Sequence, residues 1–264
     1  MLPRIHLIKC NEAVYLLFST ADTISNILYR TGQWEEYLLS ISKTFLLGAS
    51  DSLVLDIGAN LGAYSIPIAK NIQNIGGKVI GFEPQRIVYY QLCGNIILNR
   101  LDNYEAINKA VGDFNGEIEM PDINYEDNSN IGAFSFHKDY REQLNIEQYM
   151  RKSKYNVPIV TLDSIPLTKS PDLIKIDVEG FELSVLKGGA NFLEKHNYPP
   201  ILFEAWDLKW FEEGKRCLLD YLSYLGYEIS LNIRQEFVAQ HPSNKVCVRF
   251  QILDGGGINM VKER

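Results

Sequence analysis

The sequence predicts an α/β fold with a mainly parallel sheet that is flanked by helices. Short, continuous apolar segments of strand length recur along the chain, and segments with helical spacing separate them. A glycine-containing turn follows the first of the central strands, as it does in many sheets that bind nucleotides. Continuous apolar strands that alternate with helices are typical of parallel sheets buried on both faces.

The first 50 residues predict a small hairpin followed by a helical cap. Two apolar stretches, Ile5–Ile8 and Ala13–Phe18, lie on either side of the turn-forming Asn11. Residues 22–47 then place apolar side chains at helical spacing, with a break near Gly32. We expect this part to cover one side of the sheet.

From residue 51 onward the chain predicts the main domain, so we divide it into residues 1–50 and 51–264. The interval 121–155 is polar, lacks a clear period and predicts a long loop. The last two strands, separated by residues 232–245, predict an antiparallel hairpin. The elements predicted are, in order, strand Leu53–Ile57, a helix from about Gly62, strand Val79–Phe82, helix Ile87–Leu98, strand Tyr104–Val111, strand Leu173–Ile176, helix Phe181–Leu193, strand Ile201–Phe203, helix Lys215–Leu225, and strands Tyr227–Leu231 and Val246–Leu253.

Charge and composition narrow the classes of partner. A formal net charge of −7 argues against nonspecific binding to nucleic acid. The four cysteines are too scattered for a zinc ribbon or a redox pair, which fits a reducing, cytoplasmic interior. The first residues lack the apolar core of a secretion signal, and no apolar run approaches a membrane span of about 20 residues. We therefore expect no membrane partner, and the oligomeric state stays open.

The turn D-I-G-A-N-L-G after the first central strand favours S-adenosylmethionine over a dinucleotide as the cofactor. It differs from the dinucleotide fingerprint because its glycines are Gly58 and Gly62, with Asn60 between them. Asp56 would repel a pyrophosphate, whereas it can pair with the ammonium of S-adenosylmethionine, which has no phosphates. Glu83, after the next strand, has the charge and position to accept hydrogen bonds from a ribose. Taken singly, these residues also fit a tight connection and a solvated strand end, but their joint spacing favours a cofactor site.

The third strand is followed by residues that we expect near the adenine. Ala110 and Val111 would line the ring with their backbone, and Asp113 could reach the amino group. The sequence D-F-N-G is also a good turn, so both interpretations of Asp113 stay open.

A second stretch, PDLIKIDVEGFELSVLKGG, ends a strand in Asp177 and Glu179 where the transferable group should lie. Glu179 could instead be a helix cap, and Glu182 is best explained as a charge that suits the start of a helix.

Six segments, which span about residues 22–206, resemble the FkbM family of methyltransferases: LVLDIGANLGAYS, GFEPQ, NKAVGD, VTLDS, LIKIDVEGFELSVLKGG and ILFEAW. The resemblance implies a class I, Rossmann-like methyltransferase fold and S-adenosylmethionine as the methyl donor. It also implies Asp177 beside the methionyl end, and members of the family mostly methylate hydroxyl oxygens of natural products or sugars. The cofactor contacts that it implies are Asp56, Gly58, Asn60, Gly62 and Glu83.

Methylation of a hydroxyl requires a group that takes its proton. The candidates are Asp177, Glu179 and His137, which follows the polar segment DNSNIGAFSF. Asp177, Glu179 and Glu204 could alternatively bind Mg²⁺, whereas without a metal such a cluster raises one carboxyl pKa and favours a general base. We expect a small-molecule or saccharide acceptor, with a nicotinamide-dependent oxidoreductase and a non-catalytic cofactor-binding protein as alternatives.

Overall fold

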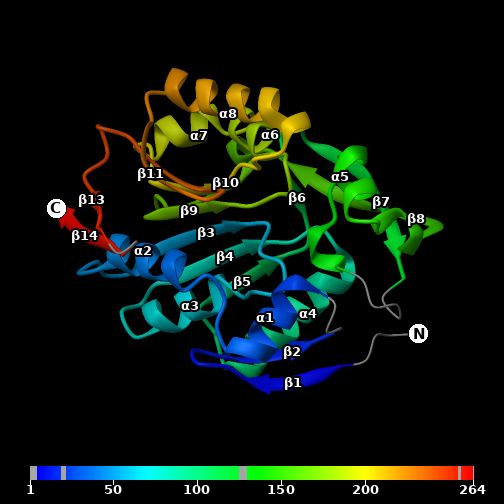
Figure 1. Ribbon diagram of the computed structural model, residues 1–264. Helices are drawn as coiled ribbons and strands as arrows, with labels where there is room; N and C mark the ends of the chain where they lie inside the picture. Colours follow the sequence, from blue (N-terminus) through cyan, green and yellow to red (C-terminus); the bar gives the residue numbers. More distant parts are fainter. Residues whose placement is uncertain (1–4, 19–21, 125–129, 255–256, 264) are drawn as a thin grey trace.

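A computed structural model describes residues 5–18, 22–124, 130–254 and 257–263. Its main sheet has seven strands in the order β11-β12-β10-β9-β3-β4-β5 (Figure 1). The strands run parallel except β12, which is antiparallel to both of its neighbours, so the predicted mainly parallel α/β sheet is confirmed. The strands are β3 (Leu53–Ile57), β4 (Lys78–Phe82), β5 (Tyr104–Ile107), β9 (Leu173–Ile176), β10 (Ile201–Glu204), β11 (Glu228–Ile233) and β12 (Glu236–Gln240).

Helices cover both faces of this sheet (Figure 1). Successive strand residues point to opposite faces, so Val54 packs in one apolar cluster while Leu55 and Ile57 pack in the other. Within the described residues, no helix is both long and apolar enough to cross a membrane. The first face carries α2 (Glu36–Leu46), α3 (Ser65–Gln73) and α4 (Arg86–Leu98), and the second carries α6 (Glu182–Lys187), α7 (Ala190–Lys195) and α8 (Glu212–Tyr224).

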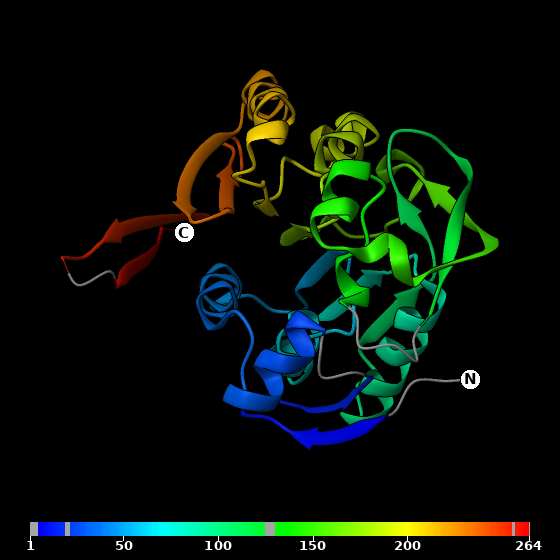
Figure 2. The ribbon, with the colours of Figure 1, turned by 45° about the vertical axis from the view of Figure 1, so that its right-hand side comes forward.

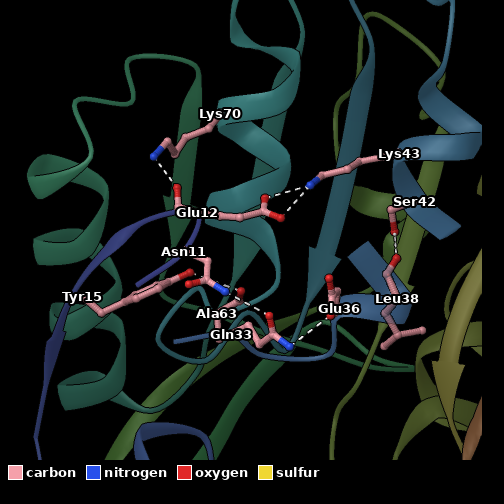
Figure 3. A network of polar contacts seen from close by, with 10 residues as sticks. All are labelled: Asn11, Glu12, Tyr15, Gln33, Glu36, Leu38, Ser42, Lys43, Ala63 and Lys70. Carbon is pink, nitrogen blue, oxygen red and sulfur yellow. Dashed lines mark hydrogen bonds and ion pairs between the residues drawn. The ribbon is translucent and has the colours of Figure 1, made fainter. Parts of the chain in front are cut away.

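The predicted N-terminal hairpin and the two helices after it are confirmed. The break between the helices occurs at Gly32, whose left-handed φ of 73° ends the first helix. Side-chain hydrogen bonds then connect the hairpin to α2 and to the segment just before α3 (Figure 3). Glu12 accepts 2.8 Å hydrogen bonds from Lys43, and the buried Tyr15 hydroxyl donates to the Ala63 carbonyl. The elements are β1 (His6–Lys9), β2 (Val14–Leu17), α1 (Thr23–Thr31) and α2.

The prediction of a long loop over 121–155 is wrong for both ends of that interval. The two ends extend strands that pair as an antiparallel ribbon, and Val111 belongs to this second sheet rather than to β5. Outward-facing charged side chains such as Glu119 and Lys154, which pair with each other, hid the strand pattern. Residues 125–129 lie outside the described part of the chain. The elements are β6 (Ala110–Val111), β7 (Gly116–Ile123), η1 (Ile131–Ala133), α5 (Lys138–Gln143), η2 (Ile146–Tyr149) and β8 (Met150–Val160).

The C-terminal hairpin was predicted with the wrong strands. The predicted loop 232–245 contains β12, which pairs with β11, so the antiparallel strand lies inside the sheet and not at its edge. Arg234, with a φ of 59°, makes the tight turn between them. The last strands, β13 (Cys247–Ile252) and β14 (Ile258–Glu263), form a separate hairpin that extends away from the main sheet (Figure 2).

Candidate active site

A cavity of about 660 Å³ lies at the carboxyl ends of the central strands. The chain leaves β3 toward β4 on one side and leaves β9 toward β10 on the other, so the strand order reverses between β3 and β9. Ligands of open α/β sheets bind at such a point. The N-terminal cap lines one side of the cavity with Asp22–Ile24 and Trp34–Glu35, and Asn130, residues 132–136 and Tyr140 line another.

The order of the strands sets the order of the charged groups along the cavity. Glu83 follows β4, the glycine turn follows β3, Asp177 follows β9, and Glu204 and Glu236 face each other across β10 and β12. Carboxylates far outnumber cations in the lining. The charged residues that line the cavity are Asp22, Glu35, Glu83, Asp113, Asp177, Glu179, Glu204 and Glu236, together with Lys109 and Lys175.

The glycine turn is shaped by a close approach of two backbones. Gly58 has a φ of 90°, and a Cβ atom there would lie 1.8 Å from the carbonyl oxygen of Asp177. Only glycine therefore lets the turn after β3 lie against the end of β9. Gly62, in contrast, leaves room for the side chains of Ile66 and Leu92, so it serves the packing of α3 against α4.

Glu83 holds the turn beside the cavity. Its Oε2 atom accepts a 2.9 Å hydrogen bond from the backbone N–H of Asn60, and its Oε1 atom accepts a 2.8 Å bond from that of Gln85. Burial raises the pKa of Glu83 to about 7, and these two N–H donors oppose the rise. The carboxylate still faces the cavity, and each of its oxygens can accept further hydrogen bonds.

A buried ammonium lies among the acidic groups. Lys175 Nζ donates a 2.8 Å hydrogen bond to Asp177 Oδ2. Burial disfavours the charge of Lys175, but the carboxylates of Asp177, Asp56, Glu35 and Glu236 outweigh this cost and hold its pKa above the usual range. Asp56 and Lys175 are direct partners in the register of β3 and β9, so they lie side by side on one face of the sheet.

The glutamates at the other end of the cavity hold their protons more strongly than free carboxyl groups do. Burial and the charge of Asp177 raise the pKa of Glu204 to about 9. Burial and the charge of Glu35 raise the pKa of Glu236 to about 9. The pKa of Glu179 is also well above its usual range, because Glu179 is buried and lies near Asp177 and Glu204. A nearby positive charge would release protons from this cluster.

The loop after β9 is held by hydrogen bonds to its own backbone. The buried Glu182 begins α6, as predicted, and its Oε1 atom accepts from the N–H groups of Val178 and Gly180. Glu179 has a φ of 55°, a strained conformation of the kind that is common at functional sites. Its carbonyl oxygen accepts from the hydroxyl of Ser135, which ties the segment over the cavity to this loop.

His137 lies beside the cavity but does not line it. Its Nε2 atom is 3.2 Å from the carbonyl oxygen of Gly180, and its ring stacks on Phe181 at 4.7 Å. A carbonyl oxygen only accepts, so Nε2 must carry the hydrogen. The structure therefore gives His137 a structural contact with this loop, and its catalytic role stays a prediction.

The three candidate metal ligands, Asp177, Glu179 and Glu204, affect one another's charge and thus form one cluster. However, among the residues that the structure describes, no group of three or more His, Cys, Asp or Glu side chains is arranged to hold a metal ion. The arrangement gives no support to the predicted Mg²⁺.

A sequence model of one family, described as the methyltransferase FkbM domain, matches residues 56–229, which is more than half of the chain. The chain belongs to the FkbM methyltransferase family. Its sheet, with a single reversed strand, has the class I methyltransferase fold that the family resemblance implied. The FkbM range runs from Asp56 into β11, so the N-terminal cap and β12 lie outside it.

Individual relatives are distant. The FkbM chain is 27% identical to Methyltransferase sdnD of Sordaria araneosa over 159 residues of alignment. The alignment covers 53% of this chain and 61% of that protein. It therefore spans less than two thirds of that relative. Methyltransferase FkbM from Methylobacillus flagellatus KT superimposes with a TM-score of 0.48 at 20% identity, over 74% of this chain and 45% of that one. TYW2 of M. jannaschii, solved in complex with AdoMet, gives a TM-score of 0.40 at 14% identity, over 90% and 84% of the two chains.

Most residues that the sequence singled out meet in the FkbM cavity. Three do not line it: His137 lies beside it, Asp56 is buried on the face that carries Lys175, and Gly62 is buried between helices. Sequence reasoning missed Lys175, Glu35 and Glu236, although a lysine inside the apolar strand L-I-K-I is a signal that a charge partner lies near. The predicted residues that do line the cavity are Gly58, Asn60, Glu83, Ala110, Val111, Asp113, Asp177, Glu179 and Glu204.

Proposed function

We propose that this FkbM protein is an S-adenosylmethionine-dependent methyltransferase that methylates a hydroxyl oxygen of a sugar or of another small, natural-product-like molecule. The observation that carries the proposal is the acidic lining of the cavity, in which eight Asp or Glu side chains accompany two lysines: Asp22, Glu35, Glu83, Asp113, Asp177, Glu179, Glu204 and Glu236 with Lys109 and Lys175. Burial raises the pKa of several of these acids, so a donor with a net positive charge is favoured because it stabilises their ionised form, whereas the pyrophosphate of a nicotinamide dinucleotide is disfavoured. A volume of about 660 Å³ is in the range of small-molecule sites.

The lining offers suitable partners for each part of the donor. Glu83 is a carboxylate acceptor for the ribose hydroxyls, beside the turn that contains Gly58 and Asn60. Ala110 and Val111 provide an apolar wall for the adenine, and Asp113 is an acceptor for its amino group. Asp177, which pairs with Lys175 at 2.8 Å, lies on the side of β9, where the methionyl end would be placed.

When bound, the donor supplies an electrophilic methyl carbon that the acceptor oxygen attacks, while the electron pair of the broken C–S bond stays on sulfur. Glu179 takes the acceptor's proton in our proposal, because it is the buried carboxylate in contact with the hydroxyl of Tyr140. The positive charge of the donor would lower the raised pKa of Glu179 and free it as a base. The N-terminal cap, which lines one side of the cavity, would help to exclude water from the reacting groups.

The test is methyl transfer from S-adenosylmethionine with a labelled methyl group to a panel of sugars and hydroxylated small molecules. We expect label in a methyl ether, and Glu179→Gln should lower kcat about 100-fold or more while donor affinity stays within about twofold. Glu213→Gln, at a side chain 73% exposed on α8, is the matched control and should keep full activity. Label found only on nitrogen or carbon atoms would refute O-methylation.

A further inference from the structure

The part of the cavity beyond β9 brings four acidic side chains together with few cations among them. We call this part the acceptor end; its lining includes Glu35, Glu179, Glu204 and Glu236. Lys175, the lysine of the described lining at this end, is already hydrogen-bonded to Asp177. Burial and repulsion by nearby carboxylates raise the pKa of all four glutamates, so a cation bound among them would release their protons and become their counterion, and the single net positive charge of S-adenosylmethionine cannot do this for all four.

One oxygen atom of these four side chains also lacks a hydrogen-bond partner in the part of the chain that the structure describes. Glu35 lies in the loop between α1 and α2, and its Oε2 atom is buried with no hydrogen-bond partner within the described chain. A buried acceptor that is left unpaired costs about 1–3 kcal/mol, so such atoms are uncommon away from ligand sites. Because Glu35 lines the cavity, a ligand there can supply the missing donor.

The cap holds this carboxylate in place. Glu35 has a φ of 42°, which is unfavourable for a residue with a side chain, and the adjacent loop is tied to the hairpin turn. The side-chain amide of Asn11 donates a hydrogen bond to Gln33, and the side-chain amide of Gln33 donates one to the carboxylate of Glu36 (Figure 3). The loop thus presents Glu35 to the cavity from outside the sheet, close enough to Glu236 for its charge to raise the pKa of that side chain.

Aromatic rings complete the lining of the acceptor end. Trp34 precedes Glu35, and Tyr140 and Phe181 flank the loop of Glu179. Tyr140 stacks on Trp206 at 4.0 Å, which fixes its ring. Aromatic faces attract organic cations, and carboxylates that lie nearby reinforce this preference.

We propose that the acceptor is an amino alcohol, such as an amino sugar, whose protonated amine is bound by Glu35 and Glu236 while its hydroxyl faces Glu179. This inference rests on the proposed methyltransferase function and adds the chemical class of the acceptor. Glu236 and Glu204 are direct neighbours across β12 and β10, so an ammonium between Glu35 and Glu236 also lies close to Glu204. Glu35 and Glu236 are both outside residues 56–229, so they are specificity-determining residues that the family match does not include.

The experiment is calorimetric titration of protein saturated with S-adenosylhomocysteine, the donor without its methyl group. The probes are glucosamine, galactosamine, mannosamine and trans-2-aminocyclohexanol, each compared with its neutral derivative in which a hydroxyl replaces the amine, which has nearly the same shape and no charge. We expect at least one amine to bind about tenfold more tightly than its derivative. Glu35→Gln and Glu236→Gln should each remove most of this difference, whereas Glu228→Gln, at an exposed position that begins β11, should leave it unchanged.

Equal affinities within every pair, tighter binding of the neutral derivatives, or no binding of any amine would overturn the inference. Binding of S-adenosylhomocysteine is measured first and separately. If it binds and the amines do not, the acceptor class is wrong and the methyltransferase proposal stands. If it does not bind, the proposed function fails as well.

Discussion

Glu83→Ala is expected to weaken the binding of S-adenosylmethionine about 100-fold or more. The change removes the carboxylate that we assign to the ribose hydroxyls, and it also leaves the N–H groups of Asn60 and Gln85 without their acceptor. Two hydrogen bonds to a charged group contribute about 3 kcal/mol or more, which corresponds to this factor. Calorimetric titration of both proteins with the donor measures it.

A matched control is Glu105→Ala on β5, because the side chain of Glu105 is 50% exposed and pairs with Lys78 outside the cavity. The control should bind the donor as the unmodified protein does. Thermal unfolding of the Glu83 variant must show that it is folded, since the turn loses two hydrogen bonds. A folded Glu83→Ala protein with unchanged donor affinity would mean that the ribose lies elsewhere.

Lys175→Met is expected to lower the free energy of unfolding by about 3–5 kcal/mol, the range found when one partner of a buried ion pair is removed. Lys175 is 5% exposed, and its ammonium is the counterion for Asp177 and Asp56. Urea unfolding followed by circular dichroism gives the value. Lys78→Met, which breaks an exposed pair, should cost about 1 kcal/mol or less.

The loss in Lys175→Met should grow with pH. Burial already raises the pKa of Glu35 to about 7 and the pKa of Glu236 to about 9, and the charge of Lys175 opposes both shifts. A carboxyl pKa that is raised in the folded state favours folding below the unfolded pKa of about 4.5, and this contribution is lost as pH rises through the folded pKa. Stability of the variant should therefore fall more steeply than that of the unmodified protein between about pH 5 and 9. Adding Asp177→Asn should restore part of the loss, and a loss independent of pH would contradict this account.

Much of the fold was predictable because it depends on local patterns. Continuous apolar segments predicted both ends of β3 and of β9 correctly, and Gly32 predicted the end of α1. The ribbon of β7 and β8 was not predictable in this way, because one of its faces meets solvent and carries charges. The strand β12 was missed because a two-residue turn at Arg234 joins it to β11 without a glycine or a proline.

The residues of the candidate site were likewise predictable only where they depend on local patterns and on the order of the strands. Residues after parallel strands, such as Gly58, Glu83 and Asp177, could be placed because the topology brings those strand ends together. Glu35 comes from the cap, far from the strands, and Glu236 comes from a strand that was not predicted. Their meeting depends on how the cap packs on the sheet, which periodicity does not specify.

The most direct test of the central claim is a calorimetric titration of the unmodified protein with S-adenosylmethionine and, separately, with NAD. We expect micromolar binding of S-adenosylmethionine, stronger at pH 8 than at pH 6 because a positive ligand releases protons from the glutamates of the cavity. NAD should not bind, because its pyrophosphate would meet the carboxylates that line the cavity. Binding of NAD without binding of S-adenosylmethionine would contradict the assignment of this cavity to a methyl donor.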